Sequence, residues 1–81
     1  MIRKVKAKVM QKPVITKHID TDFIRLDAFL KLCDAVVTGG HAKFVIQDGD
    51  VKVNGEVCTS RGKKMRKGDS AEFDGKIYTI E

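Results

Sequence analysis

The hydrophobic residues of this chain change their spacing twice, and that change constrains the fold more than any other feature. From Val14 to Ile19 apolar and polar residues alternate, which is the two-residue period of a half-buried strand. Between Asp22 and Gly49 apolar residues recur every three or four positions, as in helices that bury one face. From Val51 onward the two-residue period returns. The pattern predicts an α+β fold, with two helices packed on a small, mostly antiparallel sheet with hairpins.

The first predicted helix covers Asp22 to Leu32. Thr21 or Asp22 is the expected N-cap, because a short polar side chain there accepts a hydrogen bond from the first turn. The apolar face holds residues at positions i, i+3, i+4 and i+7, namely Leu26, Phe29, Leu30 and Cys33.

The second predicted helix runs from Gly39 to Asp48, with Thr38 as its N-cap. Gly49 follows the last periodic residue, and glycine there suits the left-handed conformation that ends many helices. The apolar face of this helix holds Ala42, Val45 and Ile46.

Two dipeptides predict hairpins in the last third of the chain. Asn54-Gly55 and Asp74-Gly75 each stand between alternating runs and suit type I′ turns. The expected strands are Val51–Val53 and Glu56–Cys58 for the first hairpin, and Ser70–Phe73 and Lys76–Ile80 for the second. A basic loop from Thr59 to Lys67 and a turn at Gly68-Asp69 are expected between them.

Length and composition limit what else the chain contains. With 81 residues there is room for one modest core and none for a separate catalytic domain. We expect residues 1–12 to form a basic strand or arm, and residues 13–81 to form a single domain. No run approaches the roughly 20 apolar residues that cross a bilayer, and no apolar signal core follows the first charges. The sequence therefore predicts a cytoplasmic protein without a membrane partner.

The chain carries a net charge of +5, and its cations gather in two clusters. They lie near the amino end and between Arg61 and Lys67, where five of seven residues are positive. Such a distribution favours an anionic partner. Cys33 and Cys58 lack companions at metal-ligand spacing and are expected to be reduced. No phosphate-binding loop motif is present, so we expect no cofactor, no metal and no small-molecule substrate.

Four short segments together resemble the S-four-type RNA-binding domain, the module named after the fourth small-subunit ribosomal protein. They are residues 23–30 (FIRLDAFL), 38–43 (TGGHAK), 48–55 (DGDVKVNG) and 67–69 (KGD). The resemblance covers about Ile15 to Phe73 and is closest to short bacterial proteins made almost entirely of this domain. The chain departs from the broader family at residues 38–41, where TGGH replaces a usual Ser-Arg pair, so that arginine's contacts are not carried over.

The resemblance implies an alpha-L RNA-binding motif that contacts structured RNA along the exposed side of both helices and the adjoining loop. The residue chemistry suits this role, since glycines at a helix N-terminus let a phosphate approach backbone N–H groups. Phosphates would also relieve the mutual repulsion of the five cations in the basic loop. The candidate RNA-binding residues are Arg25, Lys31, Thr38, Gly39, Gly40, His41, Lys43, Arg61, Lys63, Lys64, Arg66 and Lys67.

The few aromatic residues favour recognition of RNA shape and backbone over base stacking. Most of them stand at core-like positions in the sequence. The aromatic residues are Phe23, Phe29, Phe44, Phe73 and Tyr78.

The sequence therefore predicts a non-catalytic binder of structured ribosomal or transfer RNA, or of ribosomal particles, that acts in ribosome assembly or translation. Two alternatives stay open at this stage. The basic loop could dock an acidic protein partner. The domain could also supply RNA affinity to a separate RNA-modifying enzyme, as the same family does when it is attached to such enzymes.

Overall fold

The computed structural model describes residues 12–81 of the chain. The expected basic strand or arm over residues 1–12 therefore lies outside the described residues, except for Lys12, whose ammonium pairs with the Glu72 carboxylate. The elements in chain order are β1 (Val14–Lys17), β2 (Ile24–Arg25), α1 (Leu26–Leu32), α2 (Gly39–Gln47), β3 (Lys52–Val53), β4 (Glu56–Val57), β5 (Lys64–Met65), β6 (Ser70–Phe73) and β7 (Lys76–Ile80).

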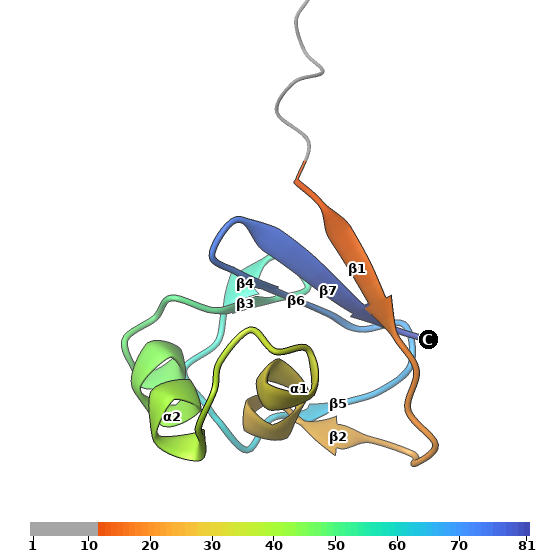
Figure 1. The fold of residues 1–81 in the computed structure, drawn as a ribbon, viewed down its shortest axis with the longest axis horizontal. Helices are drawn as coiled ribbons and strands as arrows, with labels where there is room; N and C mark the ends of the chain where they lie inside the picture. The colour runs from red at the N-terminus through yellow and green to blue at the C-terminus, as the bar shows by residue number, and fades with distance from the viewer. Residues whose placement is uncertain (1–11) are drawn as a thin grey trace, which may run out of the picture.

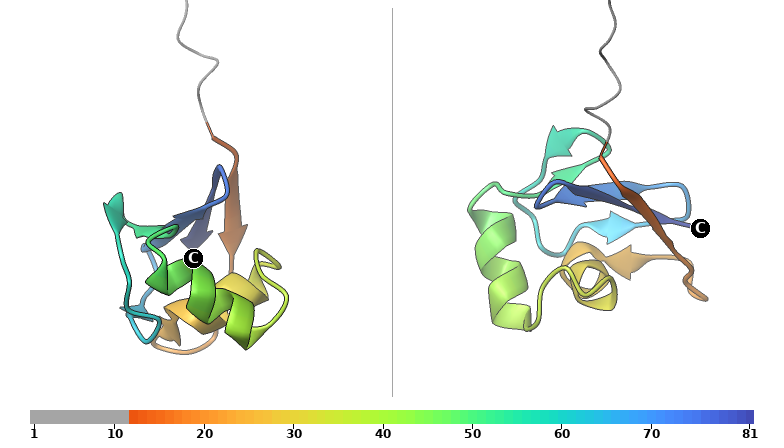
Figure 2. Two further views of the ribbon diagram at one scale, coloured as in Figure 1. Left: turned by 90° about the vertical axis from the view of Figure 1, so that its left-hand side faces the viewer. Right: turned by 45° about the horizontal axis from the view of Figure 1, so that its top comes forward.

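These elements form two sheets and two helices. The larger sheet has five strands in the order β1-β7-β6-β3-β4, and the smaller one pairs β2 with β5. All neighbours are antiparallel except β1 and β7, which pair in parallel with Val14 opposite Ile77. In Figure 1 the five-stranded sheet forms the upper layer, with α1, α2 and the β2–β5 pair below it, and the views of Figure 2 agree. The predicted α+β architecture is confirmed.

Both hairpin turns form as the sequence predicts. Asn54 and Gly55 have φ angles of 51° and 89°, and Asp74 and Gly75 have φ angles of 54° and 78°. Two consecutive positive φ angles match the type I′ turn, whose twist suits the flanking strands. The strands β6 and β7 have the predicted bounds, whereas β3 and β4 are shorter than expected.

The second helix also agrees with its sequence signals. It begins at Gly39, and the backbone N–H of His41 donates to Thr38 Oγ1 at 3.0 Å, which confirms Thr38 as the N-cap. At the other end Gly49 adopts a φ of 85° and its N–H donates to the Ile46 carbonyl at 3.1 Å. A polar cap and a left-handed glycine thus define the two ends.

The first helix begins later than predicted. Residues 22–25 are not helical, because Ile24 and Arg25 form strand β2 opposite β5. The predicted cap at Thr21 or Asp22 is therefore wrong: Arg25 occupies the N-cap position with no side-chain cap bond, and Thr21 Oγ1 donates instead to the Phe23 carbonyl at 2.8 Å. The prediction failed because a strand of two residues is too short to show a period of its own.

The segment predicted as a basic loop from Thr59 to Lys67 contains strand β5. Its partner β2 lies about forty residues earlier in the chain, so no local signal in the sequence indicates the pairing.

One hydrophobic core lies between the helices and the larger sheet. The residues predicted on the two apolar helix faces are all buried, and the Phe29 side chain has no exposed surface. Residues of the larger sheet complete the core from the other side, among them Val53, Ala71, Tyr78 and Ile80, and Met65 of β5 is buried in the same core. Within residues 12–81, neither helix is long and apolar enough to cross a membrane.

Candidate nucleic-acid interface

The β2–β5 pair separates an apolar inner surface from a positively charged outer one. Its register places Ile24 opposite Met65 and Arg25 opposite Lys64. Because side chains alternate along a strand, Met65 points inward and is fully buried, while Arg25 and Lys64 both lie on the exposed side. Two cations from distant parts of the sequence therefore stand next to each other.

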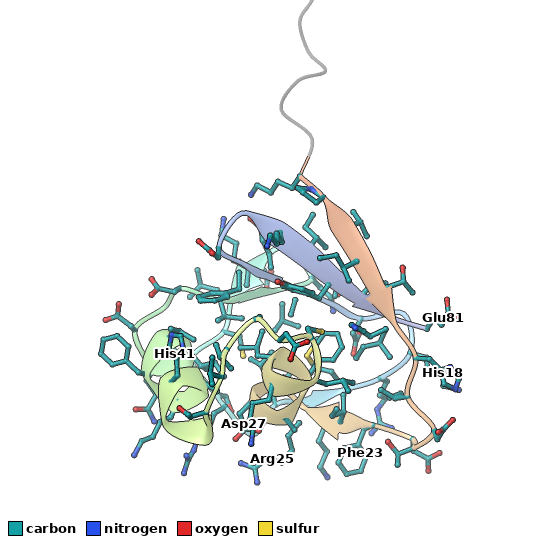
Figure 3. All side chains as sticks on the ribbon, viewed as in Figure 1. His18, Phe23, Arg25, Asp27, His41 and Glu81 are labelled. Atoms are coloured by element: carbon teal, nitrogen blue, oxygen red, sulfur yellow. The ribbon has the colours of Figure 1, made fainter. Side chains whose placement is uncertain are left out.

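The same outer surface continues by one residue before β2 and by one residue after β5. Phe23 and Arg66 follow the alternation and lie on the exposed side with Arg25 and Lys64. The Lys64 ammonium lies 4.9 Å from the centre of the Phe23 ring, and the Arg66 guanidinium carbon lies 6.0 Å from it. Figure 3 draws Phe23 and Arg25 along the lower edge of the molecule. An aromatic ring thus lies against two cations, on the same outer surface as Arg25.

Two backbone hydrogen bonds hold the loop that precedes β5 against the start of α1. The N–H of Leu26 donates to the Lys63 carbonyl at 2.8 Å, and the N–H of Asp27 donates to the Arg61 carbonyl at 3.2 Å. These bonds satisfy amides in the first turn, which have no partners within the helix. A β-carbon at Gly62 would lie 3.8 Å from Arg25 Nη2, so the loop backbone runs beside the arginine head group.

A shallow depression connects this region to the second helix. Its volume is about 240 Å³, and its lining residues are Arg25, Asp27, Ala28, Lys31 and Gly39. The structure therefore brings Arg25, Lys31 and Gly39 to one hollow, although β2, α1 and α2 each supply one of them. In Figure 1 the start of α2 lies at the lower end of the helix, toward the side that carries β2.

We call five of these cations the cationic face, namely Arg25, Lys31, Arg61, Lys64 and Arg66. The predicted site residue Lys63 instead lines a second hollow beside the β3–β4 hairpin. Arg25 is the member with an ion-pair partner in residues 12–81, since its Nη2 lies 3.2 Å from Asp27 Oδ2. The Arg25 side chain nevertheless stays 54% exposed. The face as a whole therefore retains most of its positive charge, which suits a polyanionic ligand.

The remaining predicted site residues occupy different positions. Lys43 follows Gly39 by four residues and so lies on the same side of α2, whereas His41 lies about 160° of helix rotation from Lys43. Figure 3 shows His41 on α2, well apart from Arg25 and Phe23. Thr38 is engaged as the helix cap, and Gly40 is exposed next to it. Lys67 is exposed beyond the end of β5.

Sequence reasoning missed Phe23 as a residue of this surface, because it treated most of the aromatic residues as core-like and singled out none of them for binding. The side chain is 38% exposed and belongs neither to the buried core nor to the partly buried residues packed against it. The signal that could have found it is the alternation of Phe23, Ile24 and Arg25, which places the two outer residues on one side of a strand.

Sequence reasoning placed Asp69 in a turn but missed the role of its side chain, which fixes the end of this surface. The backbone N–H of Arg66 donates to its carboxylate at 2.8 Å, and Asn54 Nδ2 donates to it at 3.2 Å. The Arg66 amide bond is the main cause that lowers the pKa of Asp69, with help from Asn54 and the charges of Lys63 and Arg66. Asp69 thereby ties the chain after β5 to the β3–β4 hairpin.

The two cysteines take no part in the cationic face. Both thiols are free, and Cys33 is buried while Cys58 is partly buried. Burial raises the pKa of the Cys33 thiol to about 11, so it stays protonated at neutral pH. No group of three or more potential metal ligands is found among residues 12–81.

Comparison with known proteins identifies the family. The sequence model of the S4 domain matches residues 17–81. The chain therefore belongs to the S4 domain family, the S-four-type module indicated by its motifs.

A curated protein agrees with this assignment. The chain is 44% identical over 57 residues to the "Probable ribosome maturation protein RlbA" of Bacillus subtilis (strain 168). The match covers 70% of this chain and 80% of that protein.

Proposed function

We propose that this chain is a non-catalytic, cytoplasmic protein that binds structured ribosomal RNA during ribosome maturation. One observation carries the proposal: residues from β2, α1 and the segment Arg61–Arg66 form a single cationic face with little internal neutralisation. The named role of the Bacillus relative, ribosome maturation, supports the choice of ribosomal RNA as ligand.

Arg25 and Lys64 bring two positive charges close together on this face. They are directly opposite in the β2–β5 register, and like charges at such positions destabilise a sheet. Asp27 offsets part of the charge of Arg25, while Arg66, which lies against the same ring as Lys64, adds to the repulsion. A phosphate backbone laid across this face would neutralise these cations together and release its own counterions.

The depression beside the start of α2 suits the sugar-phosphate backbone of an RNA duplex as its ligand. Its lining includes Arg25, Lys31 and Gly39. The depression that they line is open and shallow, and its volume of about 240 Å³ falls below the usual range of small-molecule pockets. Proteins recognise RNA duplexes largely by shape and by contacts to phosphate and sugar, which this surface can supply. The loop Arg61–Lys63 and the start of α2 would border the two sides of such a backbone.

The test is binding of the purified chain to a fluorescein-labelled RNA hairpin and to purified ribosomal RNA, measured by fluorescence anisotropy. If about five phosphates are neutralised, the affinity should fall roughly 100- to 500-fold between 50 and 200 mM salt. Absence of saturable binding to either RNA at 50 mM salt would refute the proposal.

The two alternatives have distinct outcomes in a pull-down from cell extract. Copurification of an RNA-modifying enzyme would support a role as the RNA-affinity part of that enzyme. Partners that are lost on RNase treatment support RNA binding, whereas partners that survive it support docking of an acidic protein. Catalytic turnover of RNA by the purified chain alone would contradict a non-catalytic role.

A further inference from the structure

Phe23 differs from the other exposed apolar side chains of the molecule. Phe44 and Val37 are more exposed, at 67% and 85%, but isolated exposed hydrophobic residues are normal and need no explanation. Phe23 instead stands inside the cationic face, with the ammonium of Lys64 and the guanidinium of Arg66 against its ring. Its surroundings therefore indicate a ligand that has both an aromatic and an anionic part.

The backbone of Phe23 is held in place although the ring lies outside the core. Ile24, the next residue, pairs with buried Met65 and packs against the core, which fixes the backbone beside Phe23. The Thr21 hydroxyl donates to the Phe23 carbonyl at 2.8 Å and restrains the other side of the residue. Contacts between a cation and an aromatic ring are weak at exposed sites. The long side chains of Lys64 and Arg66 can therefore leave the ring to bind an anion.

We propose that Phe23 is a stacking platform for one unpaired nucleobase, whose flanking phosphates are bound by Lys64 and Arg66. This inference rests on the proposed RNA-binding function and names the class of RNA: a duplex with an adjacent unpaired nucleotide. Every base presents a π-face, so the platform selects an unpaired base without selecting its identity.

The number of aromatic residues distinguishes this mode from binding of single strands. Proteins that bind single strands stack successive bases on several aromatic side chains. Within residues 12–81 the cationic face contains one aromatic ring, because Phe29 and Tyr78 are buried and Phe44 lies about 140° around α2 from Gly39. One base would therefore be stacked, while the remaining contacts follow the phosphates.

The experiment compares three fluorescein-labelled hairpins with the same stem, each closed by a flexible non-nucleotide linker so that no loop base is available for stacking. The first is fully paired, the second has one bulged adenosine, and the third has an abasic nucleotide at the bulge. The full chain should bind the bulged hairpin at least 5-fold more tightly than the other two, since stacking of one base contributes roughly 5- to 150-fold. Phe23→Leu should bind all three hairpins equally with an unchanged salt slope, and Phe23→Tyr should keep the preference.

Phe44→Leu is the matched control, because it removes an exposed aromatic ring elsewhere and should keep the preference for the bulged hairpin. Equal binding of the three hairpins by the unmodified chain, or a preference that survives in Phe23→Leu, would overturn the stacking platform. Should Phe23→Leu fail to fold, the bulged and abasic hairpins decide the question with the unmodified chain. Failure to bind any hairpin at 50 mM salt would instead refute the proposed function.

Discussion

The two sheets of this protein differ in what their outward and inward surfaces do. In the five-stranded sheet, Tyr78 and Ile80 on β7 are buried in the core, and β7 is paired on both sides. In the β2–β5 pair each strand has two residues, and Met65 is the fully buried side chain among them. The larger sheet is built from apolar contacts, whereas the smaller one mainly displays charge.

The comparison shows how a chain of this size can carry a group of like charges whose repulsion destabilises the folded state. Arg25 opposite Lys64 costs stability, on the order of 0.2–1 kcal/mol for a cross-strand pair of like charges. The bond from Leu26 N–H to the Lys63 carbonyl and the burial of Met65 hold the pair together despite this repulsion. Stability and ligand binding should therefore respond to mutations in different regions.

Truncation in the larger sheet should have the largest effect on stability. Ile80→Ala removes a side chain that is 1% exposed, and we expect it to lower the free energy of unfolding by about 2–5 kcal/mol. Urea denaturation followed by circular dichroism measures the change. Val14→Ala on the edge strand β1 is the control, because its side chain is 61% exposed and its loss should change stability by about 0.5 kcal/mol or less. Equal losses of unfolding free energy in the two variants would show that the buried side chains of the sheet do not stabilise it more than the exposed ones.

Removal of charge from the smaller sheet should affect RNA binding and spare stability. For Lys64→Ala/Arg66→Ala we expect the slope of log K against log salt to flatten by about two units, since two phosphate contacts are lost. The free energy of unfolding should stay within about 0.5 kcal/mol of the original value. Anisotropy titrations at four salt concentrations measure the slope.

The control for this pair is Lys52→Ala/Lys76→Ala, which removes the same charge from two exposed positions on strands of the five-stranded sheet. This variant should keep the original salt slope. If both pairs flatten the slope equally, binding depends on net charge and not on the cationic face.

The difference between the two sheets also explains what the sequence could predict. Thr38, Gly49 and the two hairpin dipeptides act on their immediate neighbours, so their effects are visible in a few consecutive residues. The β2–β5 pair depends on residues about forty positions apart and on strands of two residues. The sequence therefore places Arg25 on a helix and does not single out Phe23, although its charge clusters and family resemblance do indicate the basic residues of the site.

Asp69 connects the two regions, and its titration should weaken that connection in acid. Its pKa is lowered in the folded protein, so its contribution to stability is present above the ordinary aspartate pKa of about 4 and is lost as the pH falls below it. Asp69→Asn should cost about 1 kcal/mol at pH 7, because the carboxylate is partly exposed and accepts bonds from Arg66 and Asn54. The loss should shrink as the pH is lowered toward 2.

Urea denaturation at several pH values compares the two proteins. Glu72, whose pKa is also lowered by its bond to Lys12, contributes to the acid response of both and does not alter their difference. A gap between the two proteins that stays constant from pH 7 to 2 would contradict the role of the Asp69 charge.

The smallest expected effect separates two neighbouring glycines at the start of α2. A β-carbon at Gly39 would meet no atom within 4 Å, and one at Gly40 would lie 3.9 Å from Thr38 Oγ1, so both positions accept alanine. Because alanine loses less entropy on folding, Gly39→Ala and Gly40→Ala should each stabilise the chain by up to about 0.5 kcal/mol. Only Gly39 lines the depression beside Arg25, so Gly39→Ala alone should weaken RNA binding, by several-fold. Equal affinities of the two variants in anisotropy titrations at 50 mM salt would place the bound backbone away from this hollow, and would confine the interface to the β2–β5 pair and the loop before it.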